Sequence, residues 1–140
     1  MTEAKKIIIV DDDRDYADAM RLVLENSGFN VRHAPNLREA RAMIACGRPD
    51  LIVLDVMIEK HTDGFDFCAE LKQAPDLAAI PVLIITSVTH MTGFKFSPET
   101  DGEYCLADDY AAKPIAMADL LARVEKLLAG AAARRPGASL

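Results

Sequence analysis

Acidic, hydroxyl and lysine side chains follow four runs of the sequence that predict strands, the last of them weakly, and together they suit one kind of chemistry. The runs and the groups after them are 7–10 with Asp11, Asp12 and Asp13, 51–54 with Asp55, 81–85 with Thr86 and Ser87, and 106–112 with Lys113 and Pro114. Clustered carboxylates repel one another, so their pKa values rise unless a cation compensates. A divalent ion with oxygen ligands is the usual compensation, and Mg²⁺ suits a site that also receives phosphate.

Asp55 is the candidate nucleophile of this group. It follows the run expected to form the central strand, so its carboxylate should project into the middle of the acidic cluster. A carboxylate in that position can attack phosphorus, as in proteins that form an aspartyl phosphate. Lys113 would neutralise oxygens of the transferring group, and the Thr86 hydroxyl would donate a hydrogen bond to the product. Asp13 could be a third metal ligand, but a helix N-cap is the favoured interpretation.

These groups can meet only if strands and helices alternate along the chain. Continuous apolar runs are typical of strands buried on both faces. Helical periodicity is expected over 14–27, from Asn36 to Gly47, over 64–73 and over 117–129, between strands at 7–10, 30–34, 51–54, 81–85 and 106–112. This alternation predicts an α/β fold with a doubly wound parallel sheet. In such folds the site lies at the carboxyl ends of the strands.

Length and composition narrow the class of protein. The 140 residues suit one domain, expected over 5–129 with a flexible tail over 130–140. The net charge of −6 disfavours non-specific binding to nucleic acid. The sequence shows no signal-peptide pattern and no apolar run near the roughly 18 residues of a membrane helix, so we expect a cytoplasmic protein. Cys46, Cys68 and Cys105 are odd in number and lack a CxxC pair, which predicts reduced thiols.

At these residues the sequence resembles the receiver domain of bacterial two-component response regulators, over about 5–129, and in particular a stand-alone receiver of the chemotaxis type. The resemblance implies a flavodoxin-like five-stranded parallel sheet with strand order 2-1-3-4-5. It also implies roles for single residues. Asp55 would be the phosphoacceptor, Lys113 its lysine partner, and Thr86 and Tyr110 the switch residues; the Mg²⁺ ligands would be Asp11, Asp12, Asp55 and the backbone carbonyl of Met57.

The resemblance further implies the partners. A sensor histidine kinase or a phosphotransfer protein would donate the phosphoryl group, and an unidentified downstream protein would read the phosphorylated state in trans. We expect a monomer or weak homodimer that inserts into no membrane and is not an enzyme beyond slow autodephosphorylation. Met57 and Val88 support slow dephosphorylation, because apolar neighbours of this kind position water poorly.

Two segments depart from the family pattern and bring the signalling surface into question. Glu59 stands where proline is usual, in a loop after Asp55 that is longer than usual. The segment from 86 to 113 is also longer and is interrupted by glycine and proline, so helix four is expected to be atypical or partly replaced by a loop. Phe94 and Phe96 could lie on a docking surface there, although packing back onto the domain is the favoured interpretation.

An alternative function is a protein-interaction module on a receiver fold that no longer uses phosphate. The retained carboxylates, Thr86 and Lys113 argue against it. A phosphatase with an aspartyl nucleophile is weaker still, because Met57 stands where such an enzyme needs a second acid. Three histidines have no partner at metal-ligand spacing and are expected on the surface; they are His33, His61 and His90.

Overall fold

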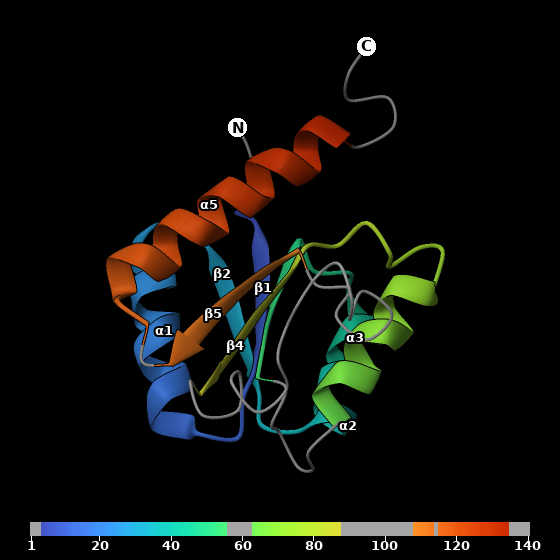
Figure 1. The fold of residues 1–140 in the computed structure, drawn as a ribbon, viewed down its shortest axis with the longest axis horizontal. Coiled ribbons are helices and arrows are strands. Elements are labelled where there is room, and N and C mark those ends of the chain that lie inside the picture. Colours follow the sequence, from blue (N-terminus) through green and yellow to red (C-terminus); the bar gives the residue numbers. More distant parts are fainter. Residues whose placement is uncertain (1–3, 56–62, 88–107, 114, 135–140) are drawn as a thin grey trace.

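Five parallel strands form one sheet between two pairs of helices (Figure 1). The structure is a computed structural model that describes residues 4–55, 63–87, 108–113 and 115–134 of the chain. Its elements are β1 (Lys6–Val10), α1 (Arg14–Asn26), β2 (Asn30–Ala34), α2 (Leu37–Cys46), β3 (Leu51–Leu54), α3 (Asp63–Gln73), β4 (Val82–Ser87), β5 (Asp109–Lys113) and α5 (Met117–Arg134). The strand order is β2-β1-β3-β4-β5, which confirms the predicted doubly wound fold.

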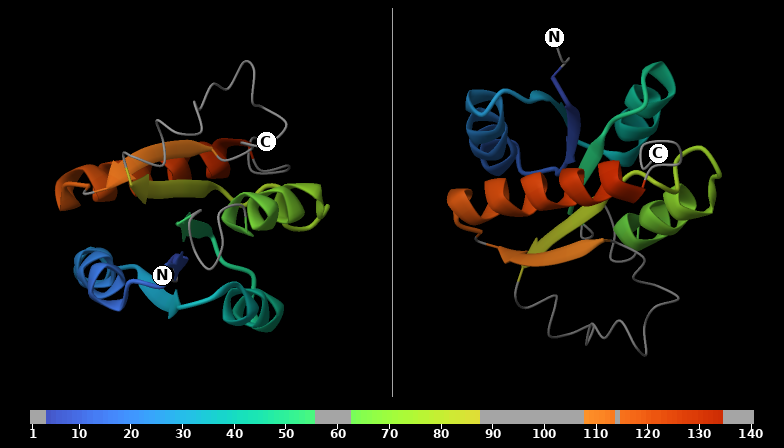
Figure 2. Two further views of the ribbon diagram at one scale, coloured as in Figure 1. Left: turned by 60° about the horizontal axis from the view of Figure 1, so that its bottom comes forward. Right: turned by 90° about the horizontal axis from the view of Figure 1, so that it is seen from above.

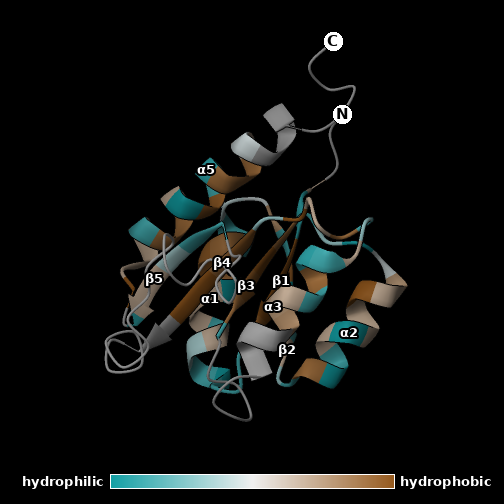
Figure 3. Ribbon diagram, turned by 45° about the vertical axis from the view of Figure 1, so that its right-hand side comes forward, coloured by the Kyte–Doolittle hydropathy of each residue, from teal (hydrophilic) through white to brown (hydrophobic). Residues whose placement is uncertain are grey.

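Both faces of the sheet are covered, as the continuous apolar runs predicted. Successive strand residues point to opposite faces, and in β1 Ile7 and Ile9 pack with α1 and α5, whereas Ile8 and Val10 pack with α2 and α3. Figure 2 shows these two helix pairs on opposite sides of the sheet, and Figure 3 shows the hydrophobic colouring of the central strands between them. The two cores hold the strand ends in fixed register.

The starts and ends of the first two helices follow local side-chain chemistry. Asp13 is the N-cap of α1, and its carboxylate accepts a hydrogen bond from the Tyr16 amide. Asn36 caps α2 in the same way, accepting from the amide of Glu39 at 2.8 Å, as predicted. The α1 helix is followed by Gly28 at a φ of 97°, a left-handed conformation that glycine adopts without a Cβ clash.

Several predicted boundaries were wrong, and the largest differences lie in β4, β5 and α5. Strand β4 continues through Thr86 and Ser87, and β5 ends at Lys113, because these residues continue the ladder: Thr86 pairs with Ala112, and Ser87 with Lys113. The helix predicted to end at residue 129 continues to Arg134, so the predicted tail begins inside α5. Alanine is the strongest helix former, so alanines 131–133 favour continuation of the helix past Gly130, whose cost in a helix is roughly 1 kcal/mol.

Several predictions fall outside the described residues. They concern Met57, Glu59, His61, Val88, His90, Phe94, Phe96, Cys105, the fourth helix and the tail from residue 135. Among the helices of the described ranges, none is both long enough and apolar enough to span a membrane.

Candidate functional site

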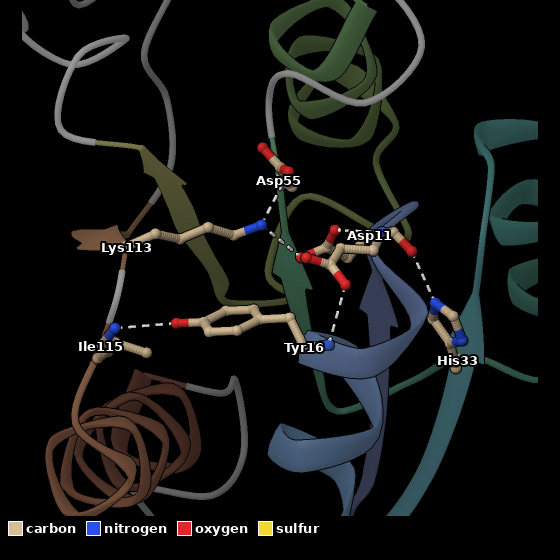
Figure 4. Close-up of polar contacts among 7 residues, drawn as sticks. Asp11, Tyr16, His33, Asp55, Lys113 and Ile115 are labelled. Carbon is tan, nitrogen blue, oxygen red and sulfur yellow. Dashed lines mark hydrogen bonds and ion pairs between the residues drawn. The ribbon is translucent and has the colours of Figure 1, made fainter.

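The carboxyl ends of three strands bring Asp11, Asp55 and Lys113 together. Val10 and Leu54 are paired across β1 and β3, and the Asp55 amide donates to the Val10 carbonyl at 2.9 Å. The two aspartates that follow are therefore neighbours. Lys113 ends β5, and its Nζ lies 2.9 Å from Asp11 Oδ2 and 3.2 Å from Asp55 Oδ2 (Figure 4). The Lys113 ammonium therefore lies within hydrogen-bonding distance of both aspartates, at the strand ends where the sequence predicted these three groups.

The turn from β1 into α1 fixes the Asp11 carboxylate. Its Oδ1 accepts a hydrogen bond from the Asp13 amide at 2.9 Å, which leaves Oδ2 facing Lys113. Asp13 in turn caps α1, accepting from the Tyr16 amide at 3.1 Å. One short turn therefore sets both the start of the helix and the direction of the acidic side chain.

Burial raises the free-energy cost of keeping the carboxylates of this site charged. Asp11 is 2% exposed and Asp55 is 8% exposed. Removal from water raises the pKa of Asp11; the hydrogen bond from the Asp13 amide and the nearby Lys113 ammonium oppose this rise, and the charge of Asp55 adds to it. Burial by itself would lower the pKa of Lys113, but the hydrogen bond and charge of Asp11, followed by those of Asp55, raise it overall. Lys113 is therefore protonated at neutral pH.

The carboxylates have the composition of a site for a hard cation. Asp11, Asp12 and Asp55 each offer an oxygen, and these three oxygens lie within 4.8 Å of one another. Two of the residues are buried and Asp12 is exposed, so the group opens to solvent on one side. Three carboxylates and one ammonium leave a negative excess, which a divalent ion with oxygen ligands would balance. The donor set fits Mg²⁺; Met57, the remaining predicted ligand, lies outside the described residues.

The predicted switch residues lie on β4 and β5. Tyr110 is paired with Ile84 and packs against the core on the α2 and α3 side of the sheet. Lys113 is three residues further along β5 and contacts Tyr16, which packs on the α1 and α5 side. The backbone of Thr86 pairs with Ala112, one position from the lysine. Tyr110 and Lys113 therefore project to opposite faces of the sheet.

Two residues that contact the site, His33 and Tyr16, were missed by the sequence analysis. His33 was expected on the surface, but it is half-buried, and its Nε2 lies 2.6 Å from the Asp11 carbonyl oxygen, to which it donates. Its position near the carboxyl end of β2, paired with Ile9, was the available signal. The Tyr16 ring lies 4.7 Å from Lys113 Nζ, and its hydroxyl accepts from the Ile115 amide at 2.9 Å.

Comparison with known proteins gives the family. The family model for the response regulator receiver domain matches residues 7–125. Response regulator MprA of Mycolicibacterium vanbaalenii is 38% identical over 123 residues, which cover 88% of this chain and 50% of that protein. The chain thus spans about half the length of the curated relatives it matches.

Solved structures agree with this match. The signal receiver domain of a signal transduction histidine kinase from Syntrophus aciditrophicus is similar with a TM-score of 0.78 and 34% identity, covering 96% of each chain. Chemotaxis response regulator CheY4 of Vibrio cholerae is similar with a TM-score of 0.75 and 28% identity, covering 90% of this chain and 99% of that one. The chain therefore belongs to the family of response regulator receiver domains of two-component systems.

Proposed function

We propose that this receiver domain accepts a phosphoryl group on Asp55 from a sensor histidine kinase or a phosphotransfer protein. One observation carries the proposal: the Lys113 ammonium bridges the buried carboxylates of Asp11 and Asp55, at 2.9 and 3.2 Å, beside the exposed acid of Asp12. The site combines a nucleophilic oxygen, a fixed positive charge and spare oxygen ligands. These are the components that phosphoryl transfer requires from a protein.

Asp55 supplies the attacking atom. One of its carboxylate oxygens attacks the phosphorus of a phosphohistidine, so that the new O–P bond forms as the P–N bond breaks. The electron pair of the broken bond stays on the imidazole, which leaves neutral because its other nitrogen already carries a proton. Lys113 is held next to the Asp55 oxygen and neutralises the oxygens of the transferring group.

Asp11, Asp12, Asp55 and the backbone carbonyl of Met57 would hold the Mg²⁺ ion. When bound, the ion would offset the negative charge of the carboxylates and of the incoming phosphoryl group. The hydrogen bond from the Asp13 amide orients the Asp11 carboxylate for ion binding in the unliganded protein.

We infer that strands β4 and β5, next to the site, transmit the effect of phosphorylation to the protein surface. Thr86 would donate its hydroxyl to the phosphoryl oxygens, and Tyr110 would change its packing in response. A protein partner in the cytoplasm would recognise the altered surface, and the phosphoryl group would be lost slowly, without enzymatic turnover. The backbone pairing of β4 with β5 supports this coupling, because it links the neighbours of Thr86, Tyr110 and Lys113 in one ladder.

Acetyl phosphate with Mg²⁺ tests the proposal. Intact-mass measurement should show one added phosphate on the native protein and none on the Asp55→Asn variant. Full labelling of that variant would show that Asp55 is not the acceptor. If the native protein takes no phosphate and beryllofluoride causes no change in its amide NMR spectrum, the phosphate-independent interaction module is the correct function instead.

A further inference from the structure

The side chain of Tyr16 joins the first helix to the lysine at the opposite end of the sequence. The face of its ring lies 4.7 Å from Lys113 Nζ, within the range of a cation–π contact. Its hydroxyl accepts a hydrogen bond of 2.9 Å from the Ile115 amide, 99 residues further along the chain. The two contacts thus hold both the ammonium of Lys113 and the backbone two residues after it.

These contacts belong to a closed cycle of contacts beside the site, and Figure 4 shows three of its members, Lys113, Asp11 and Tyr16. Lys113 bonds to Asp11 Oδ2, and Asp11 Oδ1 accepts from the Asp13 amide. The Asp13 carboxylate accepts a hydrogen bond from the Tyr16 amide, and the Tyr16 ring contacts the Lys113 ammonium, which completes the cycle. The position of the lysine is therefore tied to the same turn that orients the metal-ligand candidate Asp11.

We propose that Tyr16 is a positioning residue that holds the Lys113 ammonium beside Asp55 during phosphoryl transfer. The inference rests on the proposed function, because it concerns the lysine of that site. Lysine is a flexible side chain with considerable rotamer entropy, and this one is on β5, an edge strand. A leucine could fill the space of the ring, but it would give no π face to the ammonium and no acceptor to the amide of Ile115.

Phosphorylation would leave the charge of the Tyr16 aromatic ring unchanged, unlike that of the carboxylates. When Asp55 becomes phosphorylated, the oxygens around Lys113 change in charge and position, whereas the aromatic face stays neutral and in place. Tyr16 therefore keeps the ammonium over the site while it exchanges a carboxylate oxygen for a phosphoryl oxygen. This role is separate from ligand binding, because the Tyr16 ring faces Lys113 and its hydroxyl accepts from the Ile115 amide.

The test compares Tyr16→Phe, which keeps the ring, with Tyr16→Leu, which loses the ring and the acceptor. With acetyl phosphate as donor, Tyr16→Leu should slow labelling of Asp55 by about tenfold, and Tyr16→Phe should recover most of that loss. The Mg²⁺ concentration for half-maximal rate should stay unchanged in both variants. In a Lys113→Met background, Tyr16→Leu should cause no further loss, because the tyrosine acts through the lysine.

An NMR measurement tests the contact itself without phosphate. The ring should shift the ε-methylene protons of Lys113 upfield in the native protein and in Tyr16→Phe, and the shift should disappear in Tyr16→Leu. If Tyr16→Leu unfolds, Tyr16→Met replaces it, because methionine adapts to the space without a π face. Labelling of the leucine or methionine variant at the native rate would overturn the inference while the proposed function stands. A native protein that takes no phosphate at all would overturn the proposed function, and this inference with it.

Discussion

Replacing Lys113 by methionine should destabilise the unliganded protein in a way that Mg²⁺ reverses. The substitution keeps the apolar stem and removes the ammonium that lies 2.9 Å from Asp11 and 3.2 Å from Asp55. Two buried carboxylates would then remain beside each other without a compensating cation. Removal of one partner from a fully buried ion pair costs about 3–5 kcal/mol, and because Lys113 is 21% exposed we expect about 2–3 kcal/mol near neutral pH.

The loss should depend on pH, and the sign follows from the pKa shifts. Burial already raises the pKa of Asp11 above 3.8, and Lys113 is among the groups that oppose the rise. Without the lysine this pKa rises further, so the carboxylate takes up a proton at a higher pH and the repulsion with Asp55 disappears. In the native protein Lys113 has a raised pKa, so the lysine stays charged at every pH below 10.5, and only the protonation of its carboxylate partners weakens the interaction at acid pH. The destabilisation should therefore shrink from neutral pH towards about pH 5.

Urea unfolding with and without Mg²⁺, at the two pH values, measures these changes in the free energy of unfolding. Lys72→Met is the matched control: Lys72 is 13% exposed, and its Nζ contacts Asp108 at 2.8 Å and the Ile80 carbonyl at 2.8 Å, far from the acidic cluster. Its loss should also destabilise the fold, but Mg²⁺ should not restore it. Equal rescue of both variants by Mg²⁺, or a Lys113→Met cost that is independent of pH and Mg²⁺, would refute this account of the site.

Three further predictions concern single residues. Asp11→Asn should weaken Mg²⁺ binding at least about tenfold by calorimetry, because it removes a buried ligand charge; unchanged affinity would exclude Asp11 as a ligand. Asp13→Ala should lower the free energy of unfolding by about 1 kcal/mol through loss of the α1 cap, while Asp13→Asn should retain most of it. Gly130→Ala should stabilise the protein by up to about 1 kcal/mol in thermal unfolding, since no atom lies within 4 Å of the added Cβ in α5; a fall in stability would contradict a continuous helix there.

The sequence predicted the features that depend on periodicity and on strand ends. Continuous apolar runs such as 7–10 and 51–54 identify buried parallel strands, and parallel strands of one sheet place their carboxyl ends together. Asp11, Asp55 and Lys113 therefore converge wherever the strand order is right. The prediction needed no knowledge of side-chain conformations, because the backbone register alone makes these residues neighbours.

The contacts around that cluster could not be predicted in the same way. The Tyr16 hydroxyl meets the Ile115 amide only after α1 and α5 pack on the same face of the sheet. His33 meets the Asp11 carbonyl through the pairing of β1 with β2, and an isolated histidine gives no sign of such a partner. The end of α5 was missed because the apolar periodicity ends before Gly130, whereas alanines 131–133 continue the helix through propensity alone.

The pairing of Val10 with Leu54 determines where this protein can accept insertions without loss of chemistry. Asp11 and Asp55 are positioned from the strands that precede them, through a ladder that ends at the Asp55 amide. Added residues after Asp55 or after Ser87 leave that ladder unchanged, whereas one added residue inside β3 would turn the aspartate to the other face of the sheet. The two segments that the sequence analysis predicts to be longer than usual in the family both begin after such a strand end. Insertions in these segments therefore leave the relative positions of Asp11 and Asp55 unchanged.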